Sequence, residues 1–140
     1  MRARYGIPIT LALLLLLATT AGCGKQGEEY SHQVLHAIDQ GKLVGTKGDM
    51  QALARALSAY SVDRGGYPVG ASIQEATNAL SPAFLVVPIS VDAWGHPFAY
   101  TSDGKSYTLT APGADGRVGS ADDVVMVDGS FTQVPAAGPS

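Results

Sequence analysis

An apolar stripe in the first half of the chain is the feature that most limits its possible folds. The residues of this stripe recur at spacings of three and four: Leu43, Thr46, Met50, Leu53, Leu57 and Tyr60. The spacing places them on one face of an α-helix, which Gly65, Gly66 and Pro68 are expected to end. Because too few heptads are present for a coiled coil, the sequence predicts that this face packs against a second layer of the same domain.

The residues before the stripe give a weaker helical pattern. Val34 and Ile38 are spaced for one helix face, and Gly41 is expected to interrupt that helix. An alternative is that Thr46 and Asp49 act as a capping pair and start the helix at that point.

The second half of the chain predicts a short helix and a sheet. Ser72 and Glu75 form the N-terminal signature of a helix over 72–80. Alternating apolar residues predict strands at 98–100, 107–109, 124–127 and 130–134, with turns at 103–104 and 128–129. Trp94 and the aromatic residues of the strands are expected in the core, with a partner-binding patch as the alternative. The predicted fold class is α+β, with one long helix packed on a small antiparallel sheet.

The histidines carry little sign of catalysis or metal binding. His32 and His36 are four residues apart, so they could share a helix face and bind zinc. No third ligand is near them in the sequence, and we expect an exposed polar face instead. His96 is expected to lie in a loop. Because the sequence has no nucleophile elbow, phosphate-binding loop or paired catalytic carboxylates, we expect no enzymatic activity and no small-molecule substrate.

The first 22 residues have the layout of a bacterial export signal. Arg2 and Arg4 precede an apolar run over 7–18, which is too short to span a bilayer comfortably. Small residues then lead to Cys23, the only cysteine of the chain. This end resembles the lipobox of bacterial lipoproteins, in which the cysteine is lipidated after cleavage. The alternative is an ordinary secretory signal with an incidental cysteine.

These features predict four parts: a lipoprotein signal peptide over 1–22, a polar tether over 23–30, a folded domain over 31–134 and a frayed tail over 135–140. Acyl chains on Cys23 would hold the protein in the bacterial cell envelope, facing the periplasm. Gly24 stands where an aspartate commonly retains lipoproteins in the inner membrane, which favours the outer membrane. With 9 basic and 12 acidic side chains, the chain is not expected to bind nucleic acid.

Three motifs over residues 49–125 resemble the globular part of the major pseudopilin of type II secretion systems. The motif residues are Asp63, Gly65, Tyr67 and Pro68, then Asp92, Trp94 and Gly95, and finally the stretch 113–123. The resemblance implies a pseudopilin-like domain over 31–134 with a scaffold role, and secretion-machine or pilus-like proteins as partners. The alternative is a stand-alone envelope lipoprotein that uses the fold as a ligand- or partner-binding module.

The family begins with a short basic leader and a long apolar helix that forms the filament core. In this sequence a lipobox-like signal stands in that place, and Ala93 replaces the proline of the second motif. The resemblance therefore covers the domain, and we do not extend it to assembly into a filament.

The stretch 111–125 gathers three glycines and the carboxylates of Asp115, Asp122 and Asp123 immediately before an apolar run. These residues alone leave two alternatives: a solvated Gly/Asp hairpin, or a site where a cation offsets the repulsion between the carboxylates. The pattern is not that of an EF-hand, because Met126 stands where the closing glutamate would fall.

The resemblance to the pseudopilin implies that this loop binds calcium. It makes Asp115, Asp122 and Asp123 the carboxylate ligands, and the site is expected to be completed by Ser120 and the backbone carbonyls of Pro112 and Arg117. Calcium prefers six to eight oxygen ligands in flexible geometry, which such a mixed set can supply. The expected role is structural, with the ion pinning a long loop to the sheet.

Overall fold

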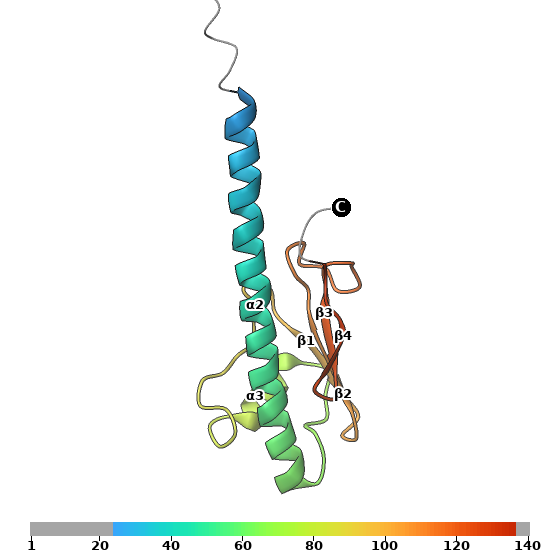
Figure 1. The fold of residues 1–140 in the computed structure, drawn as a ribbon. Helices are drawn as coiled ribbons and strands as arrows, with labels where there is room; N and C mark the ends of the chain where they lie inside the picture. The colour runs from blue at the N-terminus through green and yellow to red at the C-terminus, as the bar shows by residue number, and fades with distance from the viewer. Residues whose placement is uncertain (1–23, 137–140) are drawn as a thin grey trace, which may run out of the picture. The chain divides into compact units, whose positions relative to one another are not determined.

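A computed structural model describes residues 24–136 of the chain (Figure 1). The predicted signal peptide over 1–22, Cys23 and residues 137–140 lie outside the described part. The elements are α2 (Gly24–Arg64), α3 (Ile73–Leu80), β1 (Ala99–Ser102), β2 (Tyr107–Ala111), β3 (Val124–Val127) and β4 (Ser130–Gln133). The chain divides into two units between Leu35 and His36, and the sheet, α3 and the C-terminal part of α2 all belong to the second.

Helix α2 is longer than the sequence predicts. It continues through Gly41, where an interruption is expected, and it includes residues 24–30, for which the sequence predicts a tether. A glycine costs a helix about 1 kcal/mol relative to alanine, which a long cooperative helix tolerates. Because Thr46 lies inside the helix, the alternative in which Thr46 and Asp49 cap its start is wrong.

The predicted end of α2 is confirmed. The helix stops at Arg64, and Gly65 follows with φ +79°, a left-handed conformation that glycine adopts without strain. The N–H of Gly65 donates to the carbonyl of Ser61 at 2.9 Å, which closes the last turn. Across residues 24–136, no helix combines the length and the apolar character needed to cross a membrane.

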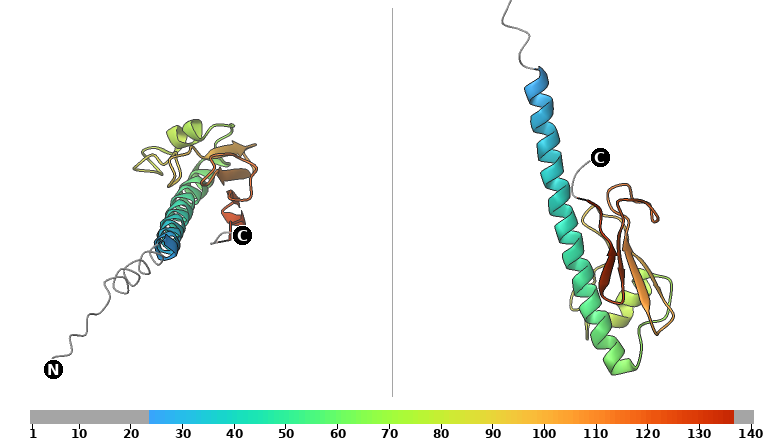
Figure 2. Two further views of the ribbon diagram at one scale, coloured as in Figure 1. Left: turned by 90° about the horizontal axis from the view of Figure 1, so that it is seen from above. Right: turned by 45° about the vertical axis from the view of Figure 1, so that its right-hand side comes forward.

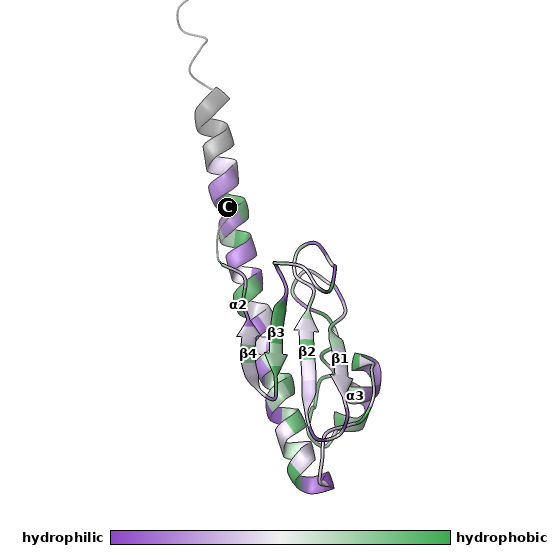
Figure 3. Ribbon diagram, turned by 90° about the vertical axis from the view of Figure 1, so that its right-hand side faces the viewer, coloured by the Kyte–Doolittle hydropathy of each residue, from purple (hydrophilic) through white to green (hydrophobic). Residues whose placement is uncertain are grey.

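The four strands form one antiparallel sheet in the order β1-β2-β3-β4 (Figure 3). The predicted turn at Asp128 and Gly129 joins β3 to β4, with φ +49° and +84°. The hairpin between β1 and β2 differs from the prediction, because its loop spans residues 103–106 rather than two residues. The Asp103 carboxylate closes this loop by accepting hydrogen bonds of 2.9 Å from the N–H groups of Lys105 and Ser106.

The core lies between the C-terminal part of α2, helix α3 and the sheet (Figures 1 and 2). Its buried apolar residues are Met50, Leu53, Ala56, Leu57, Ala76, Leu80, Leu85, Phe98, Tyr100, Tyr107, Leu109, Ala111, Val124 and Met126. Leu43 and Tyr60, at the two ends of the predicted stripe, pack against this cluster and are partly buried. The α+β fold with a helix packed on a small antiparallel sheet is therefore as predicted.

Helix α3 forms where the sequence predicts it, but without the predicted side-chain cap. Ser72 is the N-cap residue, with an extended backbone, and within the described structure its side chain makes no capping hydrogen bond. The helix is held by its apolar face instead, since Ala76 and Leu80 are buried in the core.

Candidate functional site

All six predicted metal ligands lie in the loop of residues 112–123, which connects β2 to β3. The three predicted carboxylates meet at the Ser120 hydroxyl. The Oγ atom of Ser120 donates to Oδ1 of Asp122 and lies 3.2 Å from Oδ1 of Asp123 and 3.5 Å from Oδ1 of Asp115. A hydroxyl has a single proton to donate, so it cannot satisfy three carboxylate oxygens at once.

Backbone N–H groups of the loop fix the orientation of the same carboxylates. Oδ1 of Asp115 accepts from the N–H of Arg117 at 2.8 Å, and Oδ2 of Asp122 accepts from the N–H of Asp115 at 3.0 Å. Oδ2 of Asp123, which is 2 % exposed, accepts from the N–H of Gly119 at 2.6 Å. Loop amides therefore hold the Oδ2 atoms of Asp122 and Asp123 and the Oδ1 atom of Asp115, and the Oδ1 atoms of all three residues lie near Ser120.

In the part of the chain that the structure describes, these carboxylates have no basic partner in an ion pair. Among residues 24–136, no lysine, arginine or histidine forms an ion pair with Asp115, Asp122 or Asp123. Burial raises the pKa of Asp122, but hydrogen bonds from the Ser120 hydroxyl and from loop N–H groups outweigh it and hold the pKa below its usual value. The site therefore keeps Asp122 ionised beside two further carboxylates.

Gly113 allows the two ends of the loop to come together. Its φ is +69°, and a Cβ atom built on it would lie 2.5 Å from the carbonyl oxygen of Asp122 and 2.8 Å from Oδ2 of Asp122. Atoms in a folded protein do not approach so closely, so no other residue fits here without displacing Asp122. The glycine at this position is thus part of the geometry of the site.

The donor set of the loop fits a hard cation. It offers carboxylate and hydroxyl oxygens that converge from both ends of one loop, the ligand chemistry that calcium prefers. Within the described part of the chain, no group of three or more His, Cys, Asp and Glu side chains is arranged to hold a metal ion by itself. An ion in this loop would therefore need Ser120 and backbone carbonyls as well. Pro112 is buried and Arg117 is exposed, and the role of their carbonyls stays a prediction.

A second loop, residues 92–96, contacts the loop of residues 112–123, which we call the acidic loop. Asp92 is buried, and its Oδ1 accepts hydrogen bonds from the N–H groups of Trp94, at 2.9 Å, and His96, at 2.8 Å. From this loop, Nδ1 of His96 reaches the carbonyl oxygen of Gly113 at 2.7 Å. The sequence predicts only a loop position for His96, and its contact with the acidic loop, 17 residues away, has no signal in the spacing of the motifs.

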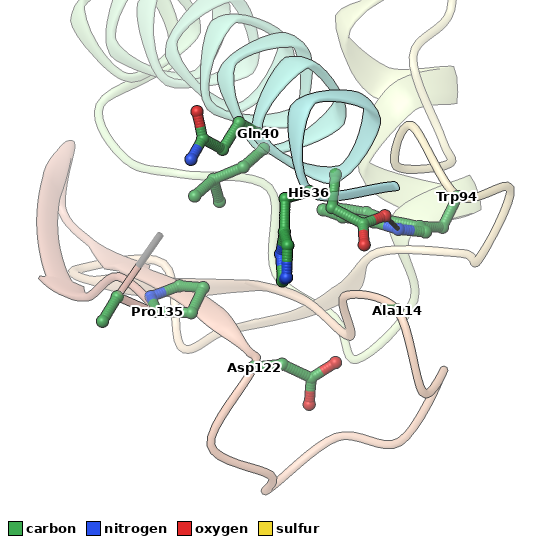
Figure 4. Close-up of a pocket in the computed structure, with 9 residues that line it drawn as sticks. His36, Gln40, Trp94, Ala114, Asp122 and Pro135 are labelled. Atoms are coloured by element: carbon green, nitrogen blue, oxygen red, sulfur yellow. Dashed lines mark hydrogen bonds between the residues drawn. The ribbon is translucent and has the colours of Figure 1, made fainter. Parts of the chain in front are cut away.

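A small cavity of about 160 Å³ lies beside the acidic loop (Figure 4). Its lining includes His36, Asp39 and Leu43 from α2, together with Trp94 and Asp122. His36 is half-buried there, whereas His32 is exposed as predicted. Trp94 is half-buried rather than in the core, and its Nε1–H donates to Oδ1 of Asp39 at 3.4 Å.

Comparison with known proteins agrees with the three motifs. Residues 33–129 match the protein family described as type II secretion system (T2SS), protein G. The chain is also similar to a protein named type II secretion system core protein G from Pseudomonas aeruginosa. The two are 34 % identical over 106 residues, which cover 65 % of this chain and 72 % of the relative. No solved structure gives a significant match. Because the family match spans the C-terminal part of α2, the acidic loop and β3, the chain belongs to the type II secretion system protein G family.

Proposed function

We propose that this protein is a calcium-binding, lipid-anchored pseudopilin with a structural role in type II secretion. Membership of the protein G family supports the link to secretion and the role as a component of the machine rather than as an enzyme. The proposed partners are other proteins of the secretion machine in the bacterial envelope. Calcium and the anchor are supported by separate observations and are tested separately.

The proposal for calcium depends on the convergence of three carboxylates on Ser120. Two unit charges about 4 Å apart repel by roughly 4 kcal/mol at the effective dielectric of a protein surface. No basic side chain among the described residues forms an ion pair with these carboxylates, and a divalent cation bound by Asp115, Asp122 and Asp123 would offset their repulsion. The bound ion would supply positive charge that ties the loop together, and so stabilise the folded state.

The thermal stability of the full-length chain in mild detergent tests calcium binding. EDTA should lower the melting temperature, and calcium, but not magnesium, should restore it. With free calcium at about 100 times Kd the stabilisation is about 2.7 kcal/mol, which corresponds to roughly 10 °C for a domain of this size. Asp123→Ala should abolish the response to calcium, because Asp123 is buried and supplies one of the converging oxygens.

Asp103→Ala is the matched control, because Asp103 also accepts backbone N–H groups in a tight turn but lies in the β1–β2 hairpin. This variant should melt at a lower temperature than the wild type and keep the full calcium response. If the wild type melts at the same temperature in EDTA and in calcium, the protein does not use a structural calcium ion.

The proposal for a lipid anchor is supported by the sequence around Cys23. A short apolar run with two preceding arginines and small residues before the cysteine is the pattern of a lipoprotein signal. Mass spectrometry of the mature N-terminus from native envelopes tests it, and a diacylated or triacylated Cys23 is the expected result. An N-methylated apolar residue at the mature N-terminus would instead indicate processing by a prepilin peptidase and entry into a filament.

A further inference from the structure

His96 reaches from the loop of residues 92–96 to the acidic loop. Its Nδ1 atom lies 2.7 Å from the carbonyl oxygen of Gly113. A carbonyl oxygen only accepts hydrogen bonds, so Nδ1 of His96 must carry the proton in this contact. The ring also fills the space beside Gly116, where a Cβ atom would lie 2.9 Å from Nε2 of His96. One imidazole thus contacts the acidic loop at two of its glycines.

The hydrogen bond to Gly113 controls a peptide group that faces a carboxylate. The Gly113 carbonyl and the Ala114 N–H belong to one planar trans peptide, so they point in opposite directions. His96 holds the carbonyl side of this peptide, and on the other side the Ala114 N–H donates a hydrogen bond to the Asp122 carboxylate. Fixing the plane from one side therefore orients a donor towards the carboxylate on the other side.

Asp92 in turn holds His96 in place. The Oδ1 atom of Asp92 accepts the backbone N–H of His96 at 2.8 Å, and the carbonyl of His96 accepts the N–H of Asp92 at 2.8 Å. The Oδ2 atom of Asp92 is buried, has no hydrogen-bond partner among the described residues, and lies 3.9 Å from Nδ1 of His96. A buried carboxylate beside Nδ1 favours the tautomer that carries the proton on this nitrogen, which is the tautomer that the contact with Gly113 needs.

We propose that His96 is a positioning residue for the acidic loop, whose Nδ1–H holds the Gly113 peptide in the orientation that the calcium site requires. The inference depends on the proposed calcium binding and identifies a residue outside the loop that sets its affinity. Residues that orient metal ligands through hydrogen bonds without binding the ion change metal affinity by about 10- to 100-fold when they are removed.

Three substitutions separate the hydrogen bond from the packing of the ring. His96→Leu keeps an apolar side chain of similar volume and removes the donor. His96→Asn places an amide near the position of Nδ1, and His96→Gln places it near the position of Nε2. In calorimetric titrations of the full-length chain with calcium, the Leu and Gln variants should bind about tenfold more weakly, and the Asn variant within about threefold of the wild type.

A second measurement reports on the hydrogen bond without calcium. In a ¹⁵N-labelled chain in EDTA at mildly alkaline pH, the two-bond ¹H–¹⁵N spectrum of His96 should show the proton on Nδ1. A solvent-exposed neutral imidazole prefers the other tautomer, so this signature distinguishes a held ring from one that only fills space.

The outcomes of these experiments are distinguishable. If the wild type binds calcium and the Leu variant binds it equally well, or if the Asn variant is as weak as the Leu variant, His96 does not position the loop and calcium binding stands. If the wild type binds no calcium, the proposed metal site is wrong and the role of His96 fails with it. Should the Leu variant not fold, equal calcium affinity of the Asn and Gln variants would overturn the proposal.

Discussion

The backbone N–H of Ala93 donates a hydrogen bond of 3.1 Å to the hydroxyl oxygen of Thr46, which is fully buried inside helix α2. Gly45 faces the same residue, since a Cβ atom built on it would lie 3.9 Å from Cβ of Ala93. The loop that carries Asp92 and His96 is therefore joined to α2 at one residue and to the acidic loop at another.

Thr46→Val is expected to destabilise the protein by about 1 kcal/mol, because it removes the acceptor of the Ala93 N–H while preserving the shape of the side chain. Thr77→Val is the control. Thr77 is also buried, but its hydroxyl lies 2.9 Å from the carbonyl oxygen of Ile73 and 3.1 Å from that of Gln74, both in its own helix, so it shares its proton within α3. Urea unfolding should show the larger loss for Thr46, and equal losses would mean that the contact with Ala93 adds no stability.

Leu57→Ala is expected to cost about 2–5 kcal/mol, because Leu57 is 1 % exposed and its truncation leaves a cavity between α2 and the sheet. Val62, on the same helix, is 85 % exposed, and Val62→Ala should change stability by less than about 0.5 kcal/mol. Chemical denaturation of both variants tests which face of α2 is buried. If Val62→Ala lost more stability than Leu57→Ala, the opposite face of α2 would be the one that packs against the sheet.

Gly113→Ala is expected to destabilise the acidic loop more than Gly119→Ala. Both glycines have positive φ, +69° and +97°, and alanine at either position costs about 1–2 kcal/mol in backbone strain. Of the two, Gly113 adds a clash, because its Cβ would lie 2.5 Å from the carbonyl oxygen of Asp122, whereas no atom of residues 24–136 lies within 4 Å of a Cβ at Gly119. The difference between the two unfolding free energies measures this clash, and no difference would mean that the loop relaxes around it.

Local sequence signals were sufficient for most of the fold. The spacing of Met50, Leu53 and Leu57 identified the buried face of α2, because apolar residues three and four positions apart lie on one side of an α-helix. The continuation through Gly41 was not predicted, because the cost of one glycine is local while the stability of a helix is shared along its length. The length of the β1–β2 loop was also not predicted. Asp103–Gly104 is typical of a two-residue turn, but the Asp103 side chain closes a longer loop equally well.

The candidate site was predictable only in part. Asp115, Asp122 and Asp123 stand out in the sequence because glycines and carboxylates gather within one short loop. His96 does not, because its contact with Gly113 joins two loops that only the folded sheet brings together. Contacts between distant loops leave no repeating pattern in the sequence, so composition and residue spacing do not predict them.

Stability at alkaline pH is expected to depend on Tyr107, which is 2 % exposed. Burial, with smaller contributions from the nearby Tyr67 and Asp128, raises the pKa of Tyr107 from 10.0 to about 12. The folded state therefore holds the Tyr107 proton more tightly than the unfolded state does. The resulting contribution to the free energy of unfolding is fully present below pH 10 and is lost as the pH rises through about 12.

Tyr107→Phe should remove this part of the pH dependence in denaturant unfolding curves measured across the alkaline range. A smaller loss should remain, because burial also raises the pKa of Tyr100, whose hydroxyl donates to the carbonyl of Pro68 at 2.7 Å. The absorbance of tyrosinate gives an independent measurement. The folded wild type should show one tyrosine that ionises at a higher pH than the others, and the Phe variant should lack it. If wild type and variant lose stability in parallel above pH 10, Tyr107 is not the group that links unfolding to pH.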